Sequence, residues 1–326
     1  MNTGRVGLAR LIVPLGVLLL VSGALIFTGS CGGSSGSSTS PNIYVVNQGS
    51  NSVTVYPLNA TGNATPAATI SGAATGLSLP GGIAVDSHGN IYVANFLGNS
   101  VTVYAAGATG NATPTATISG AATGLNGPVG VAIDSHDNIY VVNLTSNSVM
   151  VYAAGATGNA TPTAAISGAA TGLNGPEGPA VDSAGNIYVA NFHGNSVTVY
   201  AAGATGNTTP TTTISGAATG LDEPEGPVLD SHGNIYVAND ITNTVTVYAA
   251  GATGNATPTA TISGVATGLD EPEGPALDSD GNIYVANYFT NTVTVYTAGA
   301  TGNATPTSTI SGAATGLTHP RDVTVQ

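Results

Sequence analysis

The amino-acid sequence predicts an all-β fold, a six-bladed β-propeller of four-stranded antiparallel blades that the C-terminal strand closes. The phrase NIYV returns every 48 residues, and a fixed period of this length is typical of propellers and solenoids. Each repeat holds four short runs rich in β-branched and aromatic residues, which are typical of strands. The two chain ends carry complementary parts of one repeat. The phrase begins at Asn42, Asn90, Asn138, Asn186, Asn234 and Asn282.

The strands expected in one repeat stand for those of all six. The short runs cover residues 83–86, 90–95, 100–104 and 115–119. Gly, Pro, Asn or Asp separates each run from the next. These residues end strands and form turns. Because four short antiparallel strands make one propeller blade, each repeat is predicted to be one blade.

The chain ends favour a ring over an open rod. The first repeat begins at its second strand, at residue 42, and the chain finishes with residues 320–326, which align with residues 80–86. This last segment supplies the missing first strand, and such closure removes exposed sheet edges. An open solenoid is the alternative, but it would need atypical capping repeats at both ends. We therefore assign residues 42–326 to one closed propeller.

The N-terminal segment has the pattern of an export signal. Arg5 and Arg10 precede an apolar run over residues 11–27, and the small residues 28–30 lead to Cys31. This order indicates a signal peptide over residues 1–30, and the small residues before a lone cysteine resemble a bacterial lipoprotein cleavage box. We expect a lipid on Cys31, a Gly/Ser-rich tether over residues 31–41, and anchoring to a membrane of the cell envelope. Secretion after ordinary cleavage and an uncleaved anchor are the alternatives.

The exported chain is strongly acidic. One of the three arginines and all sixteen acids remain after the signal peptide, without any lysine, so the formal charge is −15. Such a surface repels phosphate backbones, which excludes a nucleic-acid partner. The single cysteine excludes an intrachain disulfide and a cysteine metal cluster. We expect a monomer whose partner is a protein, a glycan or a small molecule, and which meets the membrane through its lipid anchor only.

A family resemblance supports the propeller. The run GIAVDSHGNIYVANFLGNSVTVY over residues 82–104 resembles an NHL repeat, and the likeness covers nearly all of the chain after residue 41. It implies a six-bladed propeller like that of bacterial NHL repeat-containing lipoproteins. NHL-type propellers serve as protein-binding, RNA-binding and lyase or hydrolase scaffolds, so the resemblance does not imply one function. The family often has Asp after Tyr-Val-Ala, but this chain has Asn47, Asn95, Asn143, Asn191, Asn239 and Asn287.

The repeats differ most in charge on one face of the predicted ring. Because antiparallel strands alternate in direction, the loops after the second and fourth strands share a face. There the residue after the loop proline is a glutamate in three consecutive repeats and Arg321 at the end of the chain. We predict an acidic binding surface at this channel mouth, formed by Glu177, Glu225, Glu273, Asp222, Glu223, Asp270 and Glu271, with Asp240 on the same face.

Two interpretations of this surface stay open. It is a site for a cation or a basic partner, since carboxylate oxygens suit Ca²⁺; resemblance to gluconolactonase-like hydrolases then implies Glu177, Glu225 and Glu273 as metal candidates. Or it is a solvated acidic rim in which Arg321 pairs with a neighbouring glutamate. No cofactor is required, with Ca²⁺ as the alternative. No catalytic residue is assigned, because neither a general base nor a Ser-His-Asp set can be chosen from the spacing.

Other polar residues are expected to be structural. His88, His136 and His232 share a turn position that other repeats fill with Ala184 or Asp280, so we expect exposed turn residues. Aspartates that precede the same turn are expected to accept hydrogen bonds from its backbone; they are Asp86, Asp134, Asp182, Asp230 and Asp278. The sequence as a whole favours a non-enzymatic cell-envelope binding or scaffold propeller of unknown ligand. The alternative is a metal-dependent hydrolase or lyase with its site at the acidic channel mouth.

The export segment yields a first prediction. Cys31→Ala should release the protein from the membrane fraction or block its processing, because a thiol is needed for the lipid thioether. Fractionation followed by mass spectrometry of the N-terminal peptide measures both effects. An unmodified Cys31 within a longer mature chain would contradict the lipoprotein assignment.

Overall fold

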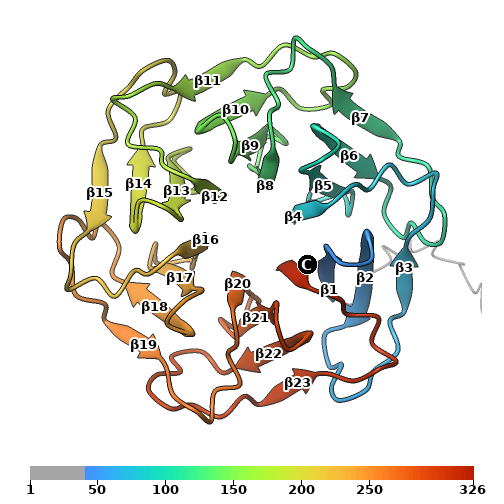
Figure 1. Cartoon of the computed structure of the whole chain (residues 1–326), viewed down its shortest axis with the longest axis vertical. Helices are drawn as coiled ribbons and strands as arrows, with labels where there is room; N and C mark the ends of the chain where they lie inside the picture. Colours follow the sequence, from blue (N-terminus) through green and yellow to red (C-terminus); the bar gives the residue numbers. More distant parts are fainter. Residues whose placement is uncertain (1–40) are drawn as a thin grey trace, which may run out of the picture. The chain divides into compact units, whose positions relative to one another are not determined.

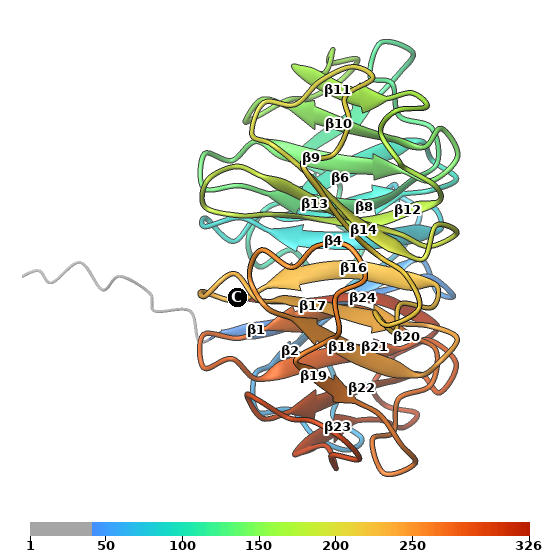
Figure 2. The ribbon, with the colours of Figure 1, turned by 90° about the vertical axis from the view of Figure 1, so that its left-hand side faces the viewer.

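The computed structural model describes residues 41–326, so the predicted signal peptide and the lipidation site Cys31 lie outside the described residues. This part of the chain forms 24 β-strands in six four-stranded antiparallel blades around a central axis (Figure 1). Seen from the side, the propeller is wider than it is deep (Figure 2). Within residues 41–326 no helix is long and apolar enough to cross a membrane. The predicted all-β propeller is confirmed.

The blades follow one another along the chain, and each runs from the axis outward. Blade 1 contains β24 (Pro320–Val325), β1 (Asn42–Asn47), β2 (Ser52–Pro57) and β3 (Ala68–Ile70). Blade 2 contains β4 (Pro80–Val85), β5 (Ile91–Asn95), β6 (Ser100–Tyr104) and β7 (Ala116–Ser119). Blade 3 contains β8 (Pro128–Ile133), β9 (Ile139–Asn143), β10 (Ser148–Tyr152) and β11 (Ala164–Ser167).

The second half of the ring has the same construction. Blade 4 contains β12 (Pro176–Val181), β13 (Ile187–Asn191), β14 (Ser196–Tyr200) and β15 (Thr212–Ser215). Blade 5 contains β16 (Pro224–Leu229), β17 (Ile235–Asn239), β18 (Thr244–Tyr248) and β19 (Ala260–Ile262). Blade 6 contains β20 (Pro272–Leu277), β21 (Ile283–Asn287), β22 (Thr292–Tyr296) and β23 (Ser308–Ile310).

The C-terminal strand closes the ring as the sequence predicts. β24 pairs antiparallel with β1, with Val323 opposite Val45. At the end of the pair, the Asn42 N–H donates to the Gln326 carbonyl at 2.6 Å and the Gln326 N–H donates back at 3.1 Å. β24 also meets β20 of blade 6 through one parallel bridge. The innermost strand of blade 1 therefore comes from the opposite end of the chain to its other three strands.

The hydrophobic core lies between neighbouring blades. Val46 and Ile70 of blade 1 pack in one cluster with Ile91 and Val93 of blade 2. The same cluster includes Tyr104, which is fully buried and whose hydroxyl donates to the Thr75 carbonyl at 2.6 Å. A buried tyrosine needs such a partner for its hydroxyl. A single blade cannot bury these residues alone, so the ring stabilises every blade.

Loops from the next blade cover the outer edges. Ile70 of β3 forms a parallel bridge with Gly110, and the Asn111 Oδ1 accepts a hydrogen bond from the Ala74 N–H at 2.7 Å. Gly72 has φ +124°, and a Cβ there would lie 2.4 Å from Asn111 Oδ1, so only glycine fits. Equivalent bridges occur at all six junctions. They occupy strand edges that would otherwise be open to pairing with another chain.

The turns between the first and second strands agree with the sequence analysis. Asp86 lies just after β4, and its Oδ1 accepts hydrogen bonds from the His88 N–H at 2.9 Å and the Asn90 N–H at 2.8 Å. The predicted capping is therefore confirmed at this position, and the equivalent aspartates make the same bonds. The innermost strands begin earlier than expected, at Pro80 in blade 2, because a bulged segment precedes the regular pairing.

Ring closure yields a second prediction. Deletion of residues 320–326 should lower the free energy of unfolding of the whole domain, because it removes an entire strand and exposes the edge of β1. Urea denaturation followed by circular dichroism measures this change, and Thr324→Ala, which keeps the strand, is the control. Equal unfolding midpoints for the parent and the truncated chain would contradict closure by β24.

Candidate functional site

Three of the predicted site residues, Glu177, Glu225 and Glu273, lie in β-bulges at the start of the innermost strands. In blade 4, Pro176 faces Asn191 and Pro179 faces Val189, so β12 carries one extra residue over this stretch. A bulge interrupts the regular alternation of side chains, and Glu177 lines the central channel here. The residues at this bulge position in successive blades are Gly81, Val129, Glu177, Glu225, Glu273 and Arg321.

Arg321 brings the three predicted glutamates together. Its Nη1 lies 2.9 Å from Glu273 Oε1, and its Nη2 lies 3.5 Å from Glu177 Oε2 and 3.8 Å from Glu225 Oε2. The guanidinium also lies 5.9 Å from the centre of the Tyr288 ring. The pairing of Arg321 with a glutamate is part of the solvated-rim alternative, and in the structure it extends to all three glutamates. A solvated rim is not what these residues form, because Glu177, Glu225 and Glu273 are only 6%, 3% and 3% exposed.

One guanidinium cannot balance three carboxylates, so the cluster favours retained protons. Burial raises the pKa of Glu177 to about 8, and the charge of Glu225 adds to this effect while Arg321 opposes it. Burial also raises the pKa of Glu225 and of Glu273, again against Arg321. Glu225 Oε1 and Glu273 Oε2 are buried without a hydrogen-bond partner. A proton held between these neighbouring carboxyl groups would supply the missing partner.

The cluster does not fit the divalent metal site that gluconolactonase-like hydrolases imply. Such a site needs several oxygen ligands that converge on the ion, whereas the Arg321 guanidinium already lies among these carboxylates. Within residues 41–326, three carboxylate or imidazole ligand atoms come within 4.8 Å of one another at Asp86, His88 and Asp137. Those residues belong to turns on the opposite face, and the oxygens of Asp86 already accept hydrogen bonds from its own turn.

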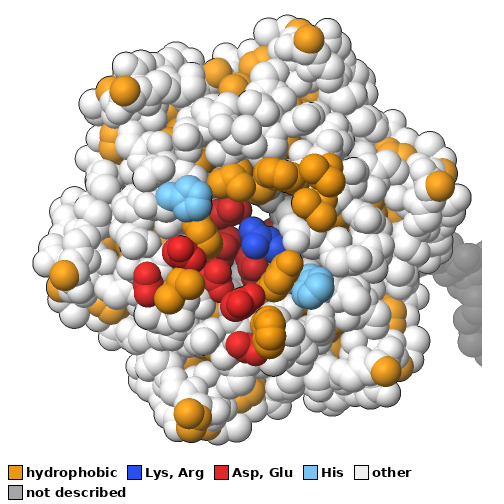
Figure 3. Space-filling model, in the orientation of Figure 1, with side chains coloured by type: hydrophobic (Ala, Val, Ile, Leu, Met, Phe, Trp, Pro, Cys, Tyr) orange, Lys and Arg blue, Asp and Glu red, His pale blue; other side chains and the backbone are white. Residues whose placement is uncertain are grey.

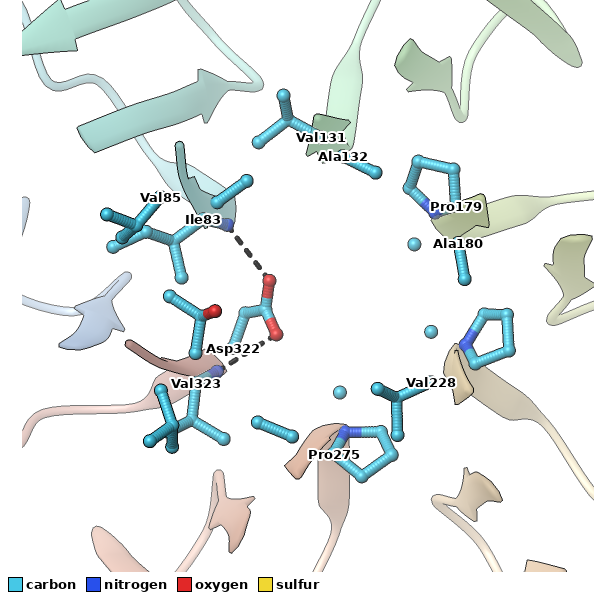
Figure 4. A pocket seen from close by; sticks show the side chains of 18 of the residues that line it. Ile83, Val85, Val131, Ala132, Pro179, Ala180, Val228, Pro275, Asp322 and Val323 are labelled. Carbon is cyan, nitrogen blue, oxygen red and sulfur yellow. Dashed lines mark hydrogen bonds between the residues drawn. The ribbon is translucent and has the colours of Figure 1, made fainter. Parts of the chain in front are cut away.

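A layer of glycines narrows the channel next to Arg321. A Cβ on Gly178 would lie 2.8 Å from the Gly226 Cα, so neighbouring strands meet backbone to backbone. In blade 1 the same position is Asp322, which accepts hydrogen bonds from the Ile83 and Val323 N–H groups, both at 2.9 Å (Figure 4). Burial raises the pKa of Asp322 to about 7. Next to this glycine layer lies a cavity of about 270 Å³ with mainly aliphatic walls. Its lining includes Val85, Val131, Pro179, Val228 and Pro275.

The remaining predicted acids lie further out at the mouth and are only partly buried. They are Asp222, Glu223, Asp270 and Glu271, and they come from the loops that precede β16 and β20. Asp240 lies close to these acids. Burial and the charges of Glu271 and Glu223 raise the pKa of Asp240 to about 6. Its Oδ1 is buried without a hydrogen-bond partner. The acids therefore gather on one side of the mouth (Figure 3).

Sequence analysis did not identify the apolar side of the mouth. Hydrophobic side chains form an arc opposite the acids (Figure 3), and a cavity of about 300 Å³ is lined by Leu79, Phe96, Val129, Leu144 and Phe192 together with Gln48, Glu177, His193, Asp240 and Arg321. The signal was available in the repeats. The residue that follows the last Asn of the second strand differs in almost every blade. These residues are Gln48, Phe96, Leu144, Phe192, Asp240 and Tyr288.

The histidines divide between the two faces. The predicted exposed turn positions of His88, His136 and His232 are confirmed. The other two lie at the mouth: His193 lines the cavity, and His319 stacks on Tyr288 with 4.7 Å between ring centres.

The asparagines that replace the family's aspartates hold the mouth loops in place. Asn95 is fully buried, its Oδ1 accepts a hydrogen bond from the Ser78 N–H at 3.1 Å, and its Nδ2 donates to the Val93 carbonyl and to Thr102 Oγ1. A carboxylate could accept but not donate, so the amide suits this position. Asn99 likewise accepts from the Gly127 N–H of the next mouth loop at 2.7 Å. The backbone of the mouth is thus fixed independently of its variable side chains.

Comparisons with known proteins agree with the fold. The family described as "Lactonase, 7-bladed beta-propeller" matches residues 37–171, which is less than half of this six-bladed chain. No curated protein matches this chain. A protein of unknown function from Bacteroides caccae is 10% identical over 88% of this chain and 99% of its own, with a TM-score of 0.61. A chain of the nidogen–laminin complex is 16% identical over 87% of this chain and 98% of its own, with a TM-score of 0.59.

An enzyme is also among the matched structures. Virginiamycin B lyase from Staphylococcus aureus is 12% identical over 67% of this chain, with a TM-score of 0.48, and this chain spans 66% of its length. At these identities the matched structures show the propeller fold alone.

The buried acids yield a third prediction. The free energy of unfolding should fall as the pH rises from about 5 to about 8, because Glu177 and Asp322 keep their protons in the folded chain after the unfolded chain has lost them. Each retained proton contributes a slope of up to about 1.4 kcal/mol per pH unit. Glu177→Gln should flatten the slope and Asp280→Asn, on the opposite face, should not. Urea denaturation at several pH values measures it; a level or rising profile in the parent would contradict the buried acids.

Proposed function

We propose that this protein is a non-enzymatic binding propeller of the bacterial cell envelope, of the NHL-repeat type. In this proposal it is exported, held to a membrane by a lipid on Cys31, and binds a positively charged partner at its channel mouth. The observation that carries the proposal is where the repeats differ. Side chains that are almost copies elsewhere diverge in charge and polarity at the innermost positions and loops of this one face. A rigid scaffold that presents variable side chains on loops is typical of a binding surface.

Charge supports a basic partner. The mouth collects Asp222, Glu223, Asp240, Asp270 and Glu271 from two neighbouring loops and a connector, and the single arginine nearby is already paired with three buried glutamates. Clefts lined by one sign of charge attract oppositely charged partners and speed their association. A partner with basic residues would also relieve the repulsion among these acids.

The geometry of the mouth does not favour the hydrolase or lyase alternative. Its divalent ion would need the glutamates that Arg321 occupies, and within the described residues the mouth offers no nucleophile hydrogen-bonded to a base. We therefore propose binding rather than catalysis at the mouth.

Binding of a hexalysine peptide tests this proposal and is the fourth prediction. The parent should bind it, more weakly as salt rises, and Glu223→Gln with Glu271→Gln should weaken binding by on the order of 1 kcal/mol because two mouth charges are lost. Isothermal titration calorimetry measures the affinity.

The matched control removes two charges from the opposite face. Asp137→Asn with Asp280→Asn changes the net charge equally, and asparagine tolerates the positive φ of 62° at position 137. An equal effect of both pairs, or no binding by the parent, would overturn the proposal.

A further inference from the structure

The mouth cavity has the dimensions of a small-molecule site. Its volume is about 300 Å³, at the lower end of the range for pockets that bind organic ligands. Its lining includes Glu177 and Arg321 together with the connectors that follow the second strands of blades 1 to 5. The site is therefore assembled from most of the ring and opens on the face where the repeats diverge.

One wall of this cavity is apolar and fixed. Phe96, Leu144 and Phe192 occupy the same position in three consecutive blades and are each half-buried. Their N–H groups donate to carbonyls of the adjoining mouth loops, at 3.1, 2.9 and 2.8 Å. A ligand that covers these side chains gains by removing apolar surface from water, and the fixed backbone reduces the ordering that binding requires.

The wall next to Phe192 is acidic. Asp240 occupies the same connector position in the next blade, and its Oδ1 is buried without a hydrogen-bond partner among the described residues. A buried polar atom without a partner is costly. Because Asp240 lines the cavity, rotation of its carboxyl group would let this oxygen accept a hydrogen bond from a ligand. Glu223, Glu271 and Asp222 add negative charge around Asp240, so a positively charged donor is favoured over a neutral one.

Other ligand classes fit this cavity less well. The guanidinium of Arg321 is shared among three glutamates, which leaves little attraction for an anion. A bare metal ion would make no use of the aromatic wall, and the converging ligand atoms that it needs do not occur at the described mouth. The pairing of an aromatic wall with an unpartnered carboxylate oxygen suits a ligand that is apolar at one end and cationic at the other.

Resting on the proposed function, we propose that the ligand of the mouth is a small organic cation, an ammonium group joined to an aromatic or alkyl body. The body packs on Phe96, Leu144 and Phe192, and the ammonium group donates to Asp240. This assigns Asp240 as the charge-recognising residue and the two phenylalanines as the residues that select for an apolar body.

Three probes separate the parts of this ligand and give the fifth prediction. 3-Phenylpropylamine carries both the apolar body and the charge, 3-phenylpropan-1-ol carries the body alone, and propylamine carries the charge without the ring. Calorimetry at pH 7.5 should show that the first binds at least about tenfold more tightly than either of the others, since a charge-assisted hydrogen bond and a buried ring are each worth about this much.

Two mouth variants test the assigned residues. Asp240→Asn should reduce the preference for the amine over the alcohol to about twofold or less, while leaving the affinity for the alcohol unchanged. Phe192→Ala should weaken the amine and the alcohol alike. Asp280→Asn on the opposite face and Phe289→Ala, which is 67% exposed and outside the cavity lining, are the matched controls and should bind as the parent does. Thermal unfolding confirms that each variant is folded.

The outcomes separate this inference from the proposed function. Equal affinity for the amine and the alcohol, or an unchanged preference in Asp240→Asn, overturns the organic-cation site even when hexalysine still binds at the mouth. Absence of binding by both hexalysine and the amine overturns the two proposals together. The predicted order of affinities with loss of preference in Asp240→Asn supports the assignment.

Discussion

The pairing of β24 with β1 is the constraint on which the rest of the structure depends. It supplies blade 1 with its innermost strand from the far end of the chain, and it places blade 1 against blade 6 through the contact of β24 with β20. Because the core lies between blades rather than within them, every blade depends on this closure. The same strand carries Arg321, where the other blades have glycine, valine or glutamate, and Asp322, where the other blades have glycine.

Ring closure and the charged residues at the axis therefore depend on the same strand, β24. Arg321 lies within 4 Å of glutamates from blades 4, 5 and 6, and Asp322 accepts a backbone hydrogen bond from Ile83 of blade 2. The closing strand thus contacts blades on both sides and across the channel. Buried ion clusters contribute less net stability than their number of contacts suggests, because each charge loses its hydration. Here the cluster joins the closing strand of blade 1 to residues of blades 4, 5 and 6.

The mouth combines a fixed backbone with variable side chains. Asn95 and Asn99, with their equivalents, hold neighbouring mouth loops through amide hydrogen bonds. The loops that cover the outer strands hold adjacent blades together through Asn111 and its equivalents. Substitutions at the connector and loop positions can therefore change chemistry without changing the fold. The result is a cavity with aromatic residues and carboxylates in its lining, within a ring of six blades of the same construction.

The sequence by itself determined the architecture of this protein. The 48-residue period, the four strand runs and the displaced segment over residues 320–326 are local patterns, and they led to blades, ring and closure because strand and turn propensities act over short distances. It also determined which face carries Glu177, Glu225 and Glu273, since strand direction follows from strand order. Only the tertiary structure decided that these glutamates are buried around Arg321, and that Phe96, Leu144 and Phe192 line one cavity together with Asp240. Burial and convergence across the axis depend on the bulges and on how closely the six blades approach one another. Strand register and distances between blades are not contained in any pattern along the chain.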